Sequence, residues 1–323
     1  MRRPLRAALV FLALLFIAAA GYVACWYAAA EALKREVQAV AATDAYPLLV
    51  GGFPKEVVLS LDRVLLSKDD WTLIAERVLV RRAMRGIEVN AEVSGPIAIR
   101  YGERAVTVSA AQPARVTLRD GAVAIAMRGA TIVLPDSTWT VRRLNLDYAP
   151  GGGTAPIPMD SRLRIVAEDI VVPEARRGPF GDTIAALQAT AQLQVRAVTT
   201  THLPDALLAW REGGRLLIGT LVRWGSLDAT ATGFYRLDTQ LLPIAQIAEL
   251  PQLLDAIQAA RWIGDAERAA VMGEARGFIP AGPNRLVVPL EVKDGAVWVH
   301  STRVTPRWPS GGTRSCTHKR DSL

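Results

Sequence analysis

The sequence has few of the residues that enzymes use most often for catalysis and for binding metals. Its 323 residues include only three histidines, His202, His300 and His318, and two cysteines, Cys25 and Cys316. No histidine has a Glu or Cys at metal-site spacing, and no Gly-x-Ser-x-Gly elbow is present. One cysteine lies in an apolar segment and the other in a polar tail, so they predict no disulfide.

The chain is basic, with a formal net charge of +7, but it lacks the features of nucleic-acid-binding proteins. Arginines are spread along the whole chain without an accompanying aromatic cluster or a nucleic-acid motif. We therefore expect no nucleic-acid partner, and the sequence predicts no cofactor and no metal. Much of the excess charge lies at the two ends, which is typical of a membrane surface or an unstructured tail. These terminal cations are Arg2, Arg3, Arg6, Arg314, Lys319 and Arg320.

The candidates for acid/base chemistry are few. His202 lies in a predicted loop with Asp205 three residues later, and it is the one histidine beside a plausible functional loop. The paired carboxylates Asp69-Asp70 and Glu168-Asp169 are sequence neighbours, which point to opposite faces of a strand and do not form a natural dyad. We interpret His202 as a loop residue that bonds locally, and we assign no catalytic residue.

A long apolar segment follows the N-terminal arginines. Ala7 to Ala30 contains no charged residue, which exceeds the roughly 20 residues that a helix needs to cross a membrane. By the positive-inside rule the three preceding arginines place the N-terminus in the cytoplasm and the body outside. An uncleaved signal anchor is favoured, because the run exceeds the roughly 7–15 apolar residues of a cleaved signal peptide. Cleavage after an alanine-rich stretch, or a lipoprotein signal ending at Cys25, stays open.

Residues 1–45 are expected to form this anchor and a helical stalk. Ala28 to Ala42 continues with helical periodicity, and we favour a plain stalk over a partner-binding helix. The helix should end by Tyr46-Pro47. Three aromatic residues near the far end of the apolar run are expected at the membrane interface. They are Tyr22, Trp26 and Tyr27.

After Pro54 the apolar residues recur mostly with period two, which predicts strands. The fold class is therefore mainly β with some α, built of curved antiparallel sheets with a few packed helices. The Gly/Pro-rich stretch Ala149–Met159 divides residues 46–150, an N-terminal β-rich half, from residues 151–308, a C-terminal β-rich half with helices. Residues 309–323 form a basic tail that we expect to be disordered. Leu187 to Ala197 should be a strand with one dry and one wet face.

Two Asp-Gly pairs between alternating apolar residues predict tight hairpins. In Leu118–Ala126, Leu118 should face Val123 and Val116 should face Ile125. In Leu290–His300, Leu290 should face Val299 and Val292 should face Val297. We expect the later hairpin to be covered by the neighbouring helices, and the earlier one to be open.

Helices are predicted mainly in the C-terminal half, over Leu203–Glu212, Leu250–Trp262 and Asp265–Ala275. The tryptophans of this half are interpreted as core residues, with an apolar groove as the alternative. They are Trp210, Trp224, Trp262, Trp298 and Trp308.

At residues 223–243 the chain resembles the domain-of-unknown-function family twenty-one twenty-five of proteobacteria. The resemblance implies an inner-membrane anchor and a β-rich periplasmic body, and no established activity. The basic tail, residues 309–323, departs from the pattern of this family. The strand pattern is also similar to that of AsmA-like envelope proteins, by fold-level analogy alone. The matching positions are Trp224, Gly225, Leu227, Gly233, Leu237, Asp238, Leu253-Leu254-Asp255, Leu290–Val299 and Gly51–Pro54.

Three functions are compatible with the sequence. The first is an envelope binding or scaffolding protein whose apolar sheet holds a lipid or another envelope protein, because the one-sided strands outnumber the helices that could cover them. The second is a hydrolase acting on envelope material, with His202 and Asp205 as its candidates. The third is a purely structural module whose strands bury one another.

Overall fold

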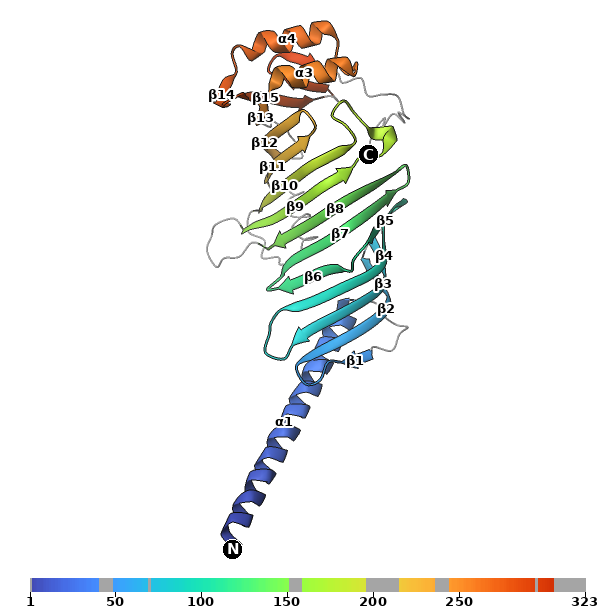
Figure 1. The fold of residues 1–323 in the computed structure, drawn as a ribbon, viewed down its shortest axis with the longest axis vertical. Helices are drawn as coiled ribbons and strands as arrows, with labels where there is room; N and C mark the ends of the chain where they lie inside the picture. The colour runs from blue at the N-terminus through green and yellow to red at the C-terminus, as the bar shows by residue number, and fades with distance from the viewer. Residues whose placement is uncertain are drawn as a thin grey trace, which may run out of the picture. The chain divides into compact units, whose positions relative to one another are not determined.

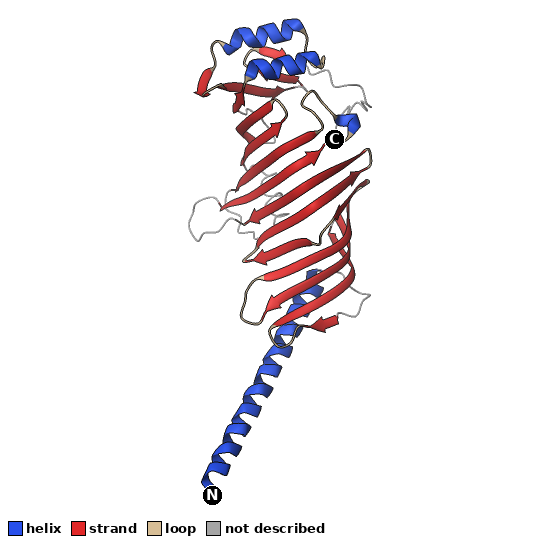
Figure 2. Ribbon diagram, viewed as in Figure 1, coloured by secondary structure: helices blue, strands red, loops and turns tan. Residues whose placement is uncertain are grey.

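The computed structural model describes residues 2–40, 49–68, 71–150, 159–195, 215–235, 244–293 and 296–304. The protein is mainly β, with one large antiparallel sheet and a few helices, as the sequence predicts (Figure 2). The chain divides into two units by its internal contacts. Of the described residues, the first unit holds 2–150 and Ser161–Glu168, and the second holds Met159, Asp160 and the residues from Asp169 onward.

Long strands make up most of the first unit (Figure 1), and six strands within it or at its edge have 13 residues each. The elements are α1 (Arg2–Val40), β1 (Leu49–Gly51), β2 (Glu56–Lys68), β3 (Trp71–Ala83), β4 (Val89–Tyr101), β5 (Arg104–Ala110), β6 (Ala114–Arg119), β7 (Ala122–Leu134), β8 (Ser137–Ala149) and β9 (Met159–Val171).

The earlier hairpin forms as predicted. Leu118 faces Val123 and Val116 faces Ile125 across β6 and β7. The turn residues Asp120 and Gly121 have φ values of 50° and 78°. A type I′ turn needs positive φ at both positions, which explains the Asp-Gly pair.

Left-handed residues within the strands change which residues face the core. In β2 the buried residues are odd-numbered up to Leu61 and even-numbered from Val64, and Arg63 between them has a φ of 55°. Leu61 and Val64 belong to the same buried cluster. The left-handed residue therefore resets the alternation, so that apolar side chains stay on one face along the whole strand.

The same device occurs in β7. Val123, Ile125 and Met127 are half-buried, Ala130 is fully buried, and Gly129 between them has a φ of 61°. Gly129 also accepts a hydrogen bond from the backbone N–H of Ala111 at 3.0 Å. This contact holds the short connection between β5 and β6 against β7.

The C-terminal part of α1 packs on the sheet (Figure 1). Ala30 and Leu33 are 4% and 1% exposed, and they share a buried cluster with Leu59 of β2, Val80 of β3 and Ala91 of β4. The stalk predicted over Ala28–Ala42 is therefore not a free helix at Ala30 and Leu33, which cover apolar side chains of the sheet, and Ala41 and Ala42 lie outside the described residues. Within the part of the chain that the structure describes, no helix is both long and apolar enough to cross a membrane.

The second unit combines the sheet with two packed helices. Its elements are the 3-10 helix η1 (Glu174–Arg176), β10 (Thr183–Val195), β11 (Arg215–Trp224), β12 (Leu227–Tyr235), β13 (Ile244–Ala248), α3 (Leu250–Ala259), α4 (Asp265–Ala275), β14 (Ile279–Gly282), β15 (Arg285–Lys293), β16 (Ala296–Val299) and β17 (Thr302–Val304). The predicted helices at Leu250 and Asp265 are confirmed, although the first ends at Ala259.

The later hairpin belongs to the core of this unit. β15 pairs with β16 in the predicted register, with Leu290 opposite Val299 and Val292 opposite Val297. Val299 is 9% exposed and lies in one buried cluster with Leu253, Leu254 and Val271 of the two helices. The prediction that helices cover this hairpin is confirmed at Val299.

Two described tryptophans of the second unit, Trp224 and Trp262, pack around Phe180, whereas Trp298 on β16 is half-buried and lies opposite Glu291. The ring of Phe180 lies 5.2 Å from that of Trp224 and 6.0 Å from that of Trp262, both in edge contacts. Trp224 also donates its indole N–H to the carbonyl oxygen of Gly181 at 3.0 Å. The core interpretation is confirmed for this pair, whereas Trp210 and Trp308 lie outside the described residues.

One predicted strand differs in its exposure. Residues 187–192 of β10 are all half-buried, so the expected contrast between a dry and a wet face is absent over this stretch. β10 is paired along its length with β11.

Candidate functional site

Apolar side chains form continuous rows across six strands of the first unit. Residues directly opposite each other on antiparallel strands lie on the same face of the sheet, so the register alone defines these rows. The first row consists of Leu59, Val80, Ala91, Val116, Ile125 and Leu146. The second consists of Val64, Ala75, Ile97, Val108, Ile132 and Trp139. We call the surface that carries these two rows the apolar face.

Burial decreases along the first row. Leu59, Val80 and Ala91 are 0%, 8% and 8% exposed, because α1 lies over them. Val116 and Ile125 are half-buried, as is Leu146 on β8. Since α1 is the one helix in the described part of the first unit, the far end of the row has no described helix over it.

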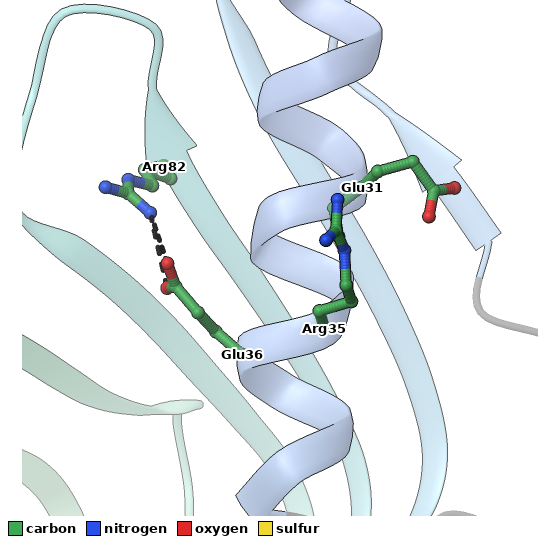
Figure 3. A network of polar contacts seen from close by, with 4 residues as sticks. All are labelled: Glu31, Arg35, Glu36 and Arg82. Atoms are coloured by element: carbon green, nitrogen blue, oxygen red, sulfur yellow. Dashed lines mark hydrogen bonds and ion pairs between the residues drawn. The ribbon is translucent and has the colours of Figure 1, made fainter.

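A third row is interrupted by a charge at the edge of the helix. It consists of Val57, Arg82, Val89, Leu118, Val123 and Tyr148. The guanidinium of Arg82 donates to both carboxylate oxygens of Glu36 on α1, at 3.3 Å each (Figure 3). The helix thus supplies the counter-charge for the one cation of this row. Beyond Arg82 the row is apolar again, and Leu118 is 41% exposed.

The opposite face of the same strands is polar. Thr117, between Val116 and Leu118, donates its hydroxyl to the side-chain oxygen of Asn90 at 3.0 Å. Arg81 pairs with Glu92 at 3.6 Å, and Arg77 pairs with Asp62 at 3.1 Å. The sheet of the first unit is therefore amphipathic, with a dry and a wet side that the register keeps separate.

The approach of α1 to the sheet is fixed by aromatic contacts at the entry to the first strands. Trp26 donates its indole N–H to the backbone carbonyl oxygen of Glu56 at 2.9 Å, and its ring lies 5.6 Å from that of Phe53. Tyr22 donates its hydroxyl to the carbonyl oxygen of Pro54 at 2.5 Å. Trp26 is 5% exposed, because the sheet covers its ring. Its expected place near a membrane interface stays a prediction.

The predicted acid/base candidates do not form a site in the described structure. His202 and Asp205 lie outside the described residues, as do Asp69 and Asp70. Glu168 is paired with Arg142 and Arg143, at 3.3 Å and 3.4 Å. No group of three potential metal-binding side chains occurs among the described residues.

His300 follows β16, as predicted, and lies near a carboxylate. Glu274 of α4 accepts hydrogen bonds from the hydroxyls of Ser301 and Thr302, the latter at 2.8 Å. Burial raises the pKa of Glu274, but the two hydroxyl donors and the nearby His300 outweigh it, so the pKa lies below the usual 4.5. The hydrogen bonds from Ser301 and Thr302 to Glu274 tie α4 to the last hairpin.

The chain matches one protein family over residues 26–306, which is most of its length. The chain belongs to the DUF2125 family. The family is described as an uncharacterized protein conserved in bacteria. Comparisons with curated proteins and with solved structures gave no match. The likeness to AsmA-like proteins has no support from these comparisons.

Two of the motifs that suggested DUF2125 serve close packing. Gly225 has a φ of 54°, and a Cβ there would lie 2.2 Å from the carbonyl oxygen of Phe180. Gly52 has a φ of 91°, and a Cβ there would lie 2.7 Å from the carbonyl oxygen of Glu56. The DUF2125 match begins at Trp26, the first α1 residue of the buried cluster.

The residues of α1 that cover the sheet were missed by the sequence analysis. They are Trp26, Ala30, Leu33 and Val37, spaced three and four residues apart. This spacing is the pattern of a one-sided helix, and it continues beyond Glu31 into the predicted stalk. The spacing of these apolar residues could have indicated that α1 packs on the sheet of the same chain.

Proposed function

We propose that the protein is an envelope protein, held at the inner membrane by its N-terminal helix, that binds the acyl chain of a lipid on the apolar face. The observation that carries the proposal is the first row, which runs from the α1-covered end at Leu59 to the half-buried Ile125 and Leu146. An extended, uninterrupted apolar row suits an extended hydrocarbon chain. Burial of apolar area supplies about 25 cal/mol per Å².

The sequence before Trp26 supports the anchor. Ala7 to Cys25 carries no charged residue, which is close to the roughly 20 residues that a spanning helix needs. Three arginines precede this run and favour a cytoplasmic N-terminus, which directs the body to the periplasm. Because Trp26 already contacts the sheet, the apolar face would start next to the membrane surface.

A scaffold that uses the same face for another envelope protein is the second candidate. The observation that favours it is the same half-buried row, because apolar faces also serve as protein interfaces. A hydrolase has less support, since its only candidates, His202 and Asp205, rest on the sequence alone.

Site-specific photo-crosslinking separates these possibilities. A photoreactive phenylalanine analogue at Ile125 lies on the apolar face, whereas the same analogue at Ala124 lies on the polar face of the same strand. Crosslinking in intact cells should give a lipid adduct at position 125 and none at 124. A protein adduct at 125 would favour the scaffold, and no adduct at 125 would contradict both.

A further inference from the structure

A cluster of arginines lies on the polar face of the first unit, opposite the apolar rows. Arg115 of β6, Arg128 of β7 and Arg143 of β8 line one hollow of about 380 Å³. Gln112 and Asn145 line it as well, and both carry amide donors. From this cluster we infer that the hollow is a binding site for a phosphate-bearing anion. The inference does not depend on the lipid proposed for the apolar face.

The register brings these arginines together on one face. Arg128 lies directly opposite Arg143, and Arg115 lies opposite Ala126, two residues before Arg128. Like charges directly opposite each other destabilise a sheet. A bound anion between the two guanidinium groups would remove this cost.

The carboxylates near the hollow form ion pairs with other arginines or with two arginines at once. Glu168 is divided between Arg142 and Arg143. Glu92 lies directly opposite Arg115 but pairs with Arg81 at 3.6 Å. The guanidinium groups of Arg115 and Arg128 form no hydrogen bond or ion pair with any residue that the structure describes. The arginines that line the hollow therefore outnumber the carboxylates that are available to pair with them.

The chemistry of arginine selects the ligand class. The planar guanidinium offers several N–H donors in a fixed fork, which matches the oxygens of a phosphate group. The small side chain of Ala126 also lines the hollow. A hollow of this size lies at the low end of the range for ligand pockets, which suits a phosphate group rather than a large organic anion.

The wall of the hollow is fixed by the backbone. Gln112 and Pro113 belong to the connection between β5 and β6, which the hydrogen bond from Ala111 to Gly129 holds in place. A Cβ at Gly129 would lie 2.8 Å from the Cβ of Ala111, so only glycine allows this approach. This wall of the hollow is therefore in place before a ligand binds, which reduces the entropic cost of binding.

Calorimetric titration of the full chain in dodecyl maltoside tests the site. The probes are inorganic pyrophosphate and dihexanoyl phosphatidylglycerol, with dihexanoyl phosphatidylcholine as the neutral counterpart. The variant R115Q/R128Q removes two of the arginines. The control R85Q/R104Q removes the same charge from two exposed arginines outside the hollow.

Pyrophosphate should bind the wild-type chain, and the affinity should fall at least tenfold in R115Q/R128Q and stay unchanged in R85Q/R104Q. Tighter binding of phosphatidylglycerol than of pyrophosphate, with the same loss in the variant, would assign the phosphate to a lipid headgroup; the reverse order would assign it to a soluble phosphate. Circular dichroism checks the fold, and R128Q alone replaces the double variant if that is unfolded. The inference is overturned if neither anion binds the wild-type chain, or if the variant and wild type bind equally.

Discussion

The indole N–H of Trp26 in α1 donates a hydrogen bond to the backbone carbonyl oxygen of Glu56, the first residue of β2, at 2.9 Å. This bond joins the helix to the sheet at the point where the first long strand begins. Together with the contact of Trp26 on Phe53, it determines where α1 leaves the sheet. The part of the apolar face that α1 covers depends on this junction.

Replacing Trp26 should therefore loosen the helix from the sheet. Trp26→Phe removes the hydrogen bond and should lower the free energy of unfolding by about 0.5–1.5 kcal/mol. Trp26→Ala also removes the buried ring and should cost about 3–5 kcal/mol. Thermal unfolding in detergent, followed by circular dichroism, measures both. Tyr27→Ala is the control, because Tyr27 is 62% exposed; an equal loss there would contradict the role of Trp26.

Gly129→Ala should be much more damaging than Gly102→Ala. Both glycines have a positive φ, 61° and 55°, so both substitutions carry a backbone cost of about 1–2 kcal/mol. A Cβ at Gly102 meets nothing within 4 Å, whereas a Cβ at Gly129 lies 2.8 Å from Ala111. We expect a total cost of about 2–5 kcal/mol at Gly129 from chemical unfolding. Equal costs would show that the β5–β6 connection moves freely.

Glu274→Gln should change the acid stability of the second unit. The folded pKa of Glu274 lies below its usual 4.5, so its charged form stabilises the fold above pH 4.5, and this contribution is lost as the pH falls through the lowered folded value. The difference in melting temperature between wild type and Glu274→Gln should therefore be largest near neutral pH and shrink in acid. A difference that stays constant between pH 7 and pH 3 would contradict this assignment.

The proposed topology rests on the N-terminal arginines. Alkaline phosphatase fused after Val304 should be active, because the enzyme works only outside the cytoplasm, and green fluorescent protein at the same place should be dark. Reversing the charge at the arginines, in R2E/R3E/R6E, should reduce the phosphatase signal. A fluorescent fusion of the unaltered chain would place the body in the cytoplasm and overturn the anchor orientation.

The sequence predicts the hairpins well, because their registers depend on local signals. Asp120-Gly121 adopts the positive φ values of a type I′ turn, and this turn alone sets Val116 opposite Ile125. The helices that begin at Leu250 and Asp265 are predictable for a similar reason. The residues that start and end a helix lie close to it in sequence, so they can be recognised without knowing the fold.

The sequence alone does not show that the residues of the apolar face form one continuous surface. Its rows require the pairing of strands far apart in the chain, such as Ala91 with Val116. The left-handed residues Arg63 and Gly129 also break the simple alternation, so that period-two reading assigns half of each strand to the wrong face. The packing of Leu33 on the sheet is hard to predict, because the preceding apolar run resembles a membrane-spanning helix. That resemblance conceals the one-sided helical spacing to which Leu33 belongs.

The central claim, a lipid on the apolar face, is tested most directly by native mass spectrometry of the full chain extracted in detergent. The wild-type chain should carry a mass shift of one lipid, and Ile125→Asp should lose it while folding normally, because the new carboxylate on this half-buried position blocks the apolar row and stays near solvent. Ala124→Asp, on the polar face of the same strand, should keep the lipid. A wild-type chain without lipid, or an Ile125→Asp chain that retains it, would contradict the account.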